Sequence, residues 1–250
     1  MIYRRLNINL TQYCKGESPK NFQQKCLCVL LLDVSGSMRK GLEGNDSIRR
    51  IDKLNEGIAR FYDDIINAKS GVAKTTKNQL EIAIIKFDQE PIIIRKPGLL
   101  ESTDVPPILE ERGSTTETVK AIEAALDLVS ERKRFYNDTG QKFYRPMIVL
   151  ITDGKPSSPQ RKIDMMGEEI TRRVKQKEIY MVGLSLIGNI NHETMSKLSG
   201  GQYKFAVNEF EFSKFFQWLS VSVSNLSKSS DDSDIDFDDI EDSWKDNIPD

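Results

Sequence analysis

The sequence CLCVLLL, at residues 26 to 32, is an unbroken apolar run that stops at Asp33. A strand in the middle of a parallel sheet is buried on both faces, so it is apolar at every position instead of at every second one. The sequence MIVLI, at residues 147 to 151, repeats the pattern and is followed by Thr152 and Asp153. The two runs therefore predict two central strands that each lead into an acidic residue.

The rest of the chain alternates between strand and helix patterns. Helical spacing of apolar residues recurs between short apolar runs. We expect strands at residues 80–87, 91–95, 179–186 and 203–206, and helices at residues 51–65, 118–135, 165–177, 192–198 and 210–226. This alternation predicts an α/β fold, a doubly wound and mainly parallel central sheet flanked by helices on both faces.

Length and composition indicate one globular domain with extensions. The chain has 250 residues, of which 38% are hydrophobic and 30% charged, and no apolar run approaches the roughly 18 residues that span a bilayer. We divide it into a lead-in at 1–25, a domain at 26–226 and an acidic tail at 227–250. No apolar segment follows Arg4 and Arg5 in the lead-in, so we expect no signal peptide, no membrane association and a cytoplasmic location.

The charge distribution is uneven. Residues 231–250 hold ten acidic residues and one lysine, a charge of −9, whereas the whole chain has a net charge of −2. Such a segment predicts a solvated, disordered tail and argues against nucleic-acid binding. The tail also contains Phe237 and Trp244, which leave open a second interpretation, a peptide that docks on a partner.

Cysteine and histidine are too few for several kinds of site. The cysteines are Cys14, Cys26 and Cys28, the last two on one side of a strand, and the single histidine is His192. A zinc site built on the cysteines would lack a fourth ligand, so two core thiols and a loose one are the simpler interpretation. Catalysis by a Ser-His-Asp or Cys-His arrangement would depend on one histidine at one place.

Oxygen side chains follow both central strands. Asp33, Ser35 and Ser37 stand at alternate positions after the first strand, and Asp153 follows the second. In an open parallel sheet, ligands bind beyond the carboxyl ends of the strands. Carboxylate and hydroxyl oxygens without nitrogen or sulfur suit Mg2+ or Mn2+ and are poor ligands for Zn2+ or Cu2+. The pattern predicts a divalent-cation site at this edge of the sheet.

These residues resemble a known family. The stretch Asp33-Val34-Ser35-Gly36-Ser37, with a downstream threonine before a helix and Thr152-Asp153-Gly154 at a strand end, resembles the metal-ion-dependent adhesion site of von Willebrand factor type A domains. The resemblance covers roughly residues 26–226 and implies the Rossmann-like fold of that family. Each short motif alone is weak, but their order along the chain is specific.

The family's threonine has three candidates within Gly113 to Thr118. In the family, the positions two, five and six residues after this threonine are semi-buried. From Thr116 these are Thr118, Ala121 and Ile122, whereas from Thr115 two of them would be charged. We therefore choose Thr116. The position three residues later, often glycine in the family, is Val119 here.

The resemblance implies a binding function and no catalysis. Ser35 and Ser37 would bind the cation directly, while Asp33, Thr116 and Asp153 would bind it directly or through water. We expect Mg2+, with Mn2+ or Ca2+ as alternatives. Because Mg2+ takes six oxygen ligands in an octahedron, one position would remain for an Asp or Glu carboxylate from a protein partner.

A narrower resemblance points to one bacterial branch of the family. Residues 125–133, 144–146 and 215–220 resemble the TerY-like proteins, which are associated with tellurium resistance and stress response and tend to accompany protein kinases and phosphatases. This resemblance implies a kinase or phosphatase as the partner. The packing of a helix on the sheet is the alternative explanation for the aromatic residues of the last stretch.

Two other functions remain open. A Mg2+-dependent phosphohydrolase also places an aspartate after a buried strand, but it needs a second acid two residues later to protonate the leaving group. Ser35 stands at that position, and no phosphate-binding glycine motif is present. An adaptor with a vestigial metal site is the third possibility, against which the full set of ligand candidates argues.

Overall fold

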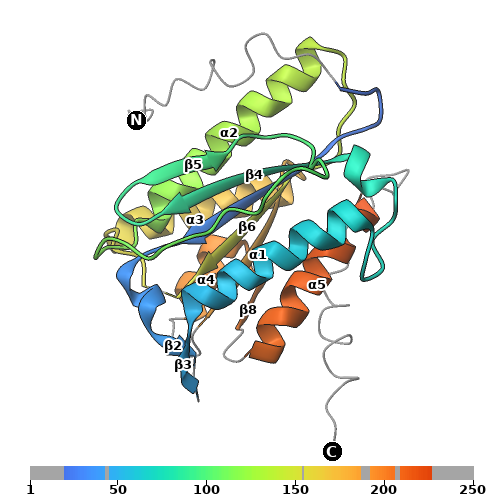
Figure 1. Cartoon of the computed structure of the whole chain (residues 1–250). Coiled ribbons are helices and arrows are strands. Elements are labelled where there is room, and N and C mark those ends of the chain that lie inside the picture. Colours follow the sequence, from blue (N-terminus) through green and yellow to red (C-terminus); the bar gives the residue numbers. More distant parts are fainter. Residues whose placement is uncertain (1–19, 43–44, 154, 187–191, 206–208, 227–250) are drawn as a thin grey trace, which may run out of the picture.

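A computed structural model describes residues 20–42, 45–153, 155–186, 192–205 and 209–226 (Figure 1). Its main sheet has six strands in the order β5-β4-β1-β6-β7-β8. Neighbouring strands are parallel, except that β4 and β5 are antiparallel. The strands are β1 (Cys26–Asp33), β4 (Leu80–Phe87), β5 (Pro91–Arg95), β6 (Met147–Thr152), β7 (Tyr180–Ser185) and β8 (Tyr203–Phe205). The predicted mainly parallel sheet is confirmed.

Helices cover both faces of the sheet (Figure 1). One face packs against α1 (Arg50–Asn67) and α5 (Glu209–Leu226), and the other against α2 (Thr118–Asp138), α3 (Gln160–Lys175) and α4 (His192–Ser199). Alternate residues of β1 serve the two layers: Cys28 and Leu30 face α1 and α5, whereas Val29 faces the opposite core. This is why β1 is apolar at every position.

The amphipathic pattern of α1 explains why it packs where it does. Its apolar residues recur at three- and four-residue spacing and are at most 1% exposed: Ile51, Leu54, Ile58, Phe61 and Ile65. Burying each such side chain contributes about 1.5–3 kcal/mol. The helix ends where Ala68 adopts a left-handed conformation with φ 51° and donates its backbone N–H to the Asp64 carbonyl.

The structure adds elements that the sequence pattern did not predict. A two-stranded hairpin, β2 (Gly41–Leu42) with β3 (Asn45–Arg49), precedes α1, and short helices η2 (Gly36–Arg39) and η3 (Thr76–Asn78) occupy two loops. The hairpin has the sequence NDSIR in its second strand, which shows no apolar alternation. Helix α3 begins at Gln160, earlier than the predicted start at residue 165, and its first three residues are polar.

Cys26 and Cys28 are buried in the same core, as predicted. Burial raises the pKa of the Cys26 thiol to about 12, so it stays protonated. No described helix is long and apolar enough to cross a membrane. Cys14, Gly154 and the acidic tail lie outside the described residues, as does most of the lead-in. The division into three segments stays a prediction.

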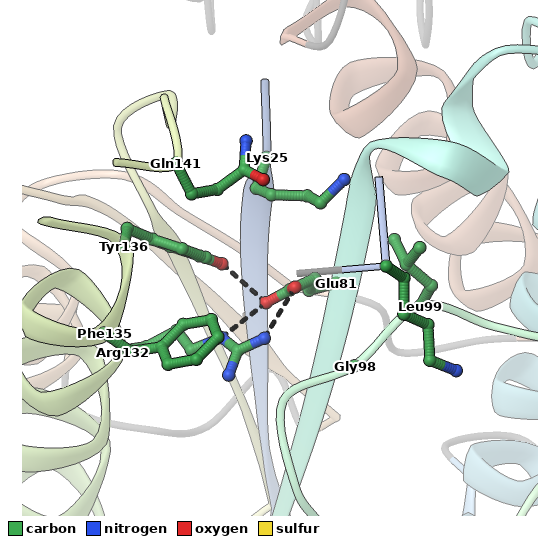
Figure 2. A pocket seen from close by; sticks show the side chains of 9 residues that line it. Lys25, Glu81, Gly98, Leu99, Arg132, Phe135, Tyr136 and Gln141 are labelled. Carbon is green, nitrogen blue, oxygen red and sulfur yellow. Dashed lines mark hydrogen bonds and ion pairs between the residues drawn. The ribbon is translucent and has the colours of Figure 1, made fainter. Parts of the chain in front are cut away.

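A buried ion pair joins α2 to the amino end of β4 (Figure 2). Arg132 Nε and Nη2 donate to Glu81 Oε2 and Oε1, both at 2.7 Å, and the Tyr136 hydroxyl donates to Oε2 at 2.6 Å. All three residues are at most 4% exposed, and they line a cavity of about 30 Å³ with Lys25 and Gln141. A buried carboxylate with a bidentate arginine and a phenol fixes helix α2 against the sheet.

We expect Glu81→Gln to lower the free energy of unfolding by about 3 kcal/mol or more, because it leaves a buried guanidinium without its counter-charge. Urea unfolding at neutral pH measures this loss. Glu90→Gln is the matched control, since Glu90 is exposed and pairs with Lys120 at the surface, and it should cost at most about 1 kcal/mol. Equal losses in both variants would contradict the structural role of the buried pair.

Candidate metal centre

The strand order brings the two predicted acidic loops together. Strands β1 and β6 are parallel neighbours, with Leu32 opposite Ile151, so both chains leave the sheet at the same edge. The Ser37 hydroxyl donates to Asp153 Oδ1 at 2.6 Å across a sequence separation of 116 residues. The Ser35 and Ser37 hydroxyl oxygens lie 3.0 Å apart. The structure therefore places four predicted site residues in one hydrogen-bonded cluster.

Both carboxylate oxygens of Asp33 are held by hydrogen bonds. Asp33 is fully buried at the end of β1. Its Oδ1 accepts the backbone N–H of Ser35 at 2.8 Å, and its Oδ2 accepts the hydroxyl of Thr152 at 2.6 Å. Thr152 belongs to the last residue pair of β6, so this bond ties the ends of the two strands. The side chain of Asp33 thus orients both loops at once.

A third loop approaches the first one closely at Gly36. A Cβ atom on Gly36 would lie 2.8 Å from the carbonyl oxygen of Gly113, so only glycine fits there without a shift of the backbone. The Arg112 backbone N–H donates to the Val34 carbonyl at 2.7 Å. These contacts place the loop before α2 beside the loop after β1.

Thr116 lies in this third loop and is held by the loop after β6. Its backbone N–H donates to Ser157 Oγ, and the Ser157 N–H donates to the Thr116 carbonyl, both at 2.9 Å. Thr116 is 6% exposed, and the positions that favoured it over Thr115 are buried: Thr118, Ala121 and Ile122. Among the described contacts, none joins the Thr116 side chain to the other four residues, so its role as a ligand stays a prediction.

Arg50 is a member of the cluster that the sequence did not reveal. Its Nη1 donates to Asp153 Oδ2 at 2.6 Å, and its Nε donates to the Gly41 carbonyl at 3.1 Å. Arg50 is only 8% exposed. No sequence signal could have found it, because it lies 103 residues from Asp153 and opens a helix, where basic residues are disfavoured.

The chain also matches one known protein family. Residues 28–155, about half of the chain, match the family model of the von Willebrand factor type A domain. The chain belongs to this family. No curated protein sequence matches the VWA chain.

Solved structures with the same fold come from distant proteins. The PilB minor pilin from Streptococcus sanguinis is similar with a TM-score of 0.59 and 13% identity, over 84% of this chain and 64% of the pilin. Proximal thread matrix protein 1 from the mussel byssus has a TM-score of 0.52 and 12% identity, over 82% of this chain and 49% of that protein. The chain thus spans less than two thirds of either. At such identities, the likeness shows the fold alone.

The charges of the VWA site favour a bound cation. Burial raises the pKa of Asp33 to about 6; the Thr152 hydrogen bond opposes this, and the nearby charge of Asp153 adds to it. With both carboxylates ionised, Asp33, Asp153 and Arg50 together carry one excess negative charge in a buried place, which is costly unless it is paired.

The donor set fits a hard divalent cation. The cluster offers carboxylate and hydroxyl oxygens and no sulfur or imidazole, which is the chemistry that Mg2+, Mn2+ and Ca2+ prefer. The described residues contain no group of three or more His, Cys, Asp or Glu side chains that could hold a metal. A centre in this part of the chain therefore has to draw on the serine and threonine hydroxyls.

The raised pKa of Asp33 predicts a pH dependence of stability in the metal-free protein. The Asp33 carboxyl has a pKa of about 6 in the folded protein, against an ordinary value of 3.8. It therefore binds protons more tightly in the folded state, so stability falls as the pH rises from about 4 to about 6. The loss is up to about 3 kcal/mol, at about 1.4 kcal/mol per unit.

Asp33→Asn removes this contribution. In chelator, the difference in unfolding free energy between Asp33→Asn and the parent should increase from pH 4 to pH 6 and be flat above about pH 7. Urea unfolding at several pH values measures it. A difference that is constant across the whole pH range would contradict the raised pKa of Asp33.

Proposed function

We propose that this VWA domain binds a protein partner through one divalent cation, Mg2+ by preference, with Mn2+ or Ca2+ as alternatives. The ligand set is Asp33, Ser35, Ser37, Thr116 and Asp153. The partner supplies an Asp or Glu carboxylate to the remaining coordination position. The observation that supports this most is the bond from Ser37 to Asp153, which joins oxygen side chains from two loops into one cluster.

Neighbouring residues position the ligand side chains. The cation would supply the positive charge that a partner carboxylate binds. The bonds from the Ser35 N–H and the Thr152 hydroxyl fix Asp33. The contacts of Thr116 with Ser157 fix the third loop. With only two carboxylates in the set, a divalent cation stays accessible to a third one from outside.

The residue two positions after Asp33 supports binding over catalysis. A phosphohydrolase would need a second acid there to protonate the leaving group. Ser35 occupies that position. A phosphohydrolase remains the alternative function, and an adaptor with a vestigial site is a further one.

For the biological setting, we propose a cytoplasmic bacterial stress-response or signalling system of the tellurium-resistance type, with a kinase or phosphatase as the partner. Its support is the TerY-like resemblance of residues 125–133, 144–146 and 215–220. Within these stretches Leu126, Val129, Phe215 and Phe216 are buried in the two cores. Packing alone accounts for them, so this part of the proposal rests on sequence resemblance.

Calorimetric titration with Mg2+ and Mn2+ tests the cation site. We expect one site per chain in the parent and no binding in Asp33→Ala, because the substitution removes a buried ligand and the anchor of both loops. Asp63→Ala is the matched control, since Asp63 lies on the surface of α1 and pairs with Lys69; it should bind as the parent does. No binding in the parent would refute the metal hypothesis.

Capture of partners from a bacterial lysate, identified by mass spectrometry, tests the role of the metal in recognition. We expect a specific partner to be retained with Mg2+, released by EDTA and absent with Ser37→Ala. A partner that stays bound in EDTA would argue for the vestigial adaptor. Metal-dependent phosphatase turnover lost in Asp33→Asn and kept in Ser35→Ala would favour the enzyme instead.

A further inference from the structure

Arg50 is in an unusual place for a buried cation. It is the first residue of α1, where the helix macrodipole is positive and disfavours positive side chains. Buried arginine is rare unless it is paired, and Arg50 is only 8% exposed. Asp153 is the only carboxylate that its guanidinium contacts in the described structure. That ion pair therefore offsets the cost of burying the guanidinium and its repulsion by the positive end of the helix dipole.

Arg50 and Ser37 together occupy both oxygens of Asp153. Ser37 donates to Oδ1 and Arg50 Nη1 donates to Oδ2, each at 2.6 Å. The guanidinium is also tied to the hairpin, because Nε donates to the Gly41 carbonyl at 3.1 Å. The Arg50 side chain is thus held at two points, the Asp153 carboxylate and the Gly41 carbonyl.

The charge balance makes this contact a competitor of a divalent cation. With Arg50 in place, the two aspartates leave a charge of −1, and a divalent cation would turn the site to +1. Without the guanidinium, the aspartates carry −2 and a divalent cation would neutralise them. Like charges close together in a buried site repel strongly, because screening by water is weak there.

We propose that Arg50 is an internal competitor of the divalent cation, which occupies Asp153 in the metal-free state and has to withdraw when the metal binds. This inference rests on the proposed metal function and deepens it. Withdrawal removes the side-chain donor from the Gly41 carbonyl, so metal binding is coupled to the β2–β3 hairpin. Arg50 sets how much cation is needed before the site fills.

The test compares Mg2+ and Mn2+ titrations of the parent, Arg50→Gln, Arg50→Lys and Arg49→Gln. Arg49→Gln is the matched control, because it removes the same charge one residue away, where Arg49 is exposed and pairs with Asp52 and Glu111. We expect Arg50→Gln to bind at least about tenfold more tightly, which equals about 1.4 kcal/mol. Arg50→Lys and Arg49→Gln should stay within about threefold of the parent.

A second measurement follows Arg50 in the parent protein itself. In heteronuclear NMR, the side-chain Nε–H resonance of Arg50, assigned with Arg50→Lys, should shift and exchange faster with water as Mg2+ is added. The thermal midpoint should also rise more with Mg2+ in Arg50→Gln than in the parent, because without metal the variant leaves Asp153 without its ion-pair partner.

The outcomes separate the two proposals. Cation binding in the parent with equal or weaker binding in Arg50→Gln, or an Arg50 resonance that does not respond to Mg2+, would overturn the role of Arg50 and leave the metal function intact. No binding in either protein would refute the metal function, and the inference with it.

Discussion

The hydrogen bond from Ser37 to Asp153 depends on one constraint, the parallel pairing of β1 with β6. Both strands are buried on both faces, so their register is fixed by two cores at once, and a slip of one residue would exchange every side chain between the cores. With Leu32 held opposite Ile151, the chains leave the sheet side by side. The oxygen cluster at that edge follows from this pairing.

The cluster is assembled at a cost in stability. Asp33 is fully buried, and burial raises its pKa to about 6, so its ionised form is disfavoured in the folded protein. Hydrogen bonds from the Ser35 N–H and Thr152 offset only part of that cost, and Arg50 compensates Asp153. The opposite end of the sheet differs: there Glu81 has a bidentate arginine and a phenol. A satisfied ion pair suits a structural role, and an excess of buried negative charge suits a cation.

Much of the fold could be predicted because the spacing of apolar residues reflects which side chains are buried. The continuous apolar runs identified β1 and β6, and the three- and four-residue spacing identified α1. All three elements pack into the hydrophobic cores. The β2–β3 hairpin escaped prediction because β2 has only two residues and the β3 sequence NDSIR shows no apolar alternation. The start of helix α3 was predicted too late, because its first three residues are polar and the buried Ile163 that follows them was not assigned to the helix.

The same distinction holds for the candidate site. Asp33, Ser35, Ser37 and Asp153 were predictable since they follow the ends of buried strands, and the structure brings them together. Arg50 and Ser157 were not, because the contacts of Arg50 with Asp153 and of Ser157 with Thr116 join residues that are distant in the chain. A local pattern carries no information on such pairs. Thr116 stands between these cases: its burial agrees with the choice made from sequence, and its contact with a cation remains a prediction.

The most direct measurement of the central claim is the anomalous scattering of Mn2+ in crystals of the protein. The account predicts one strong peak per chain at the carboxyl ends of β1 and β6, about 2.0–2.6 Å from the hydroxyl oxygens of Ser35 and Ser37. A peak at any other place, or none at saturating Mn2+, would contradict it.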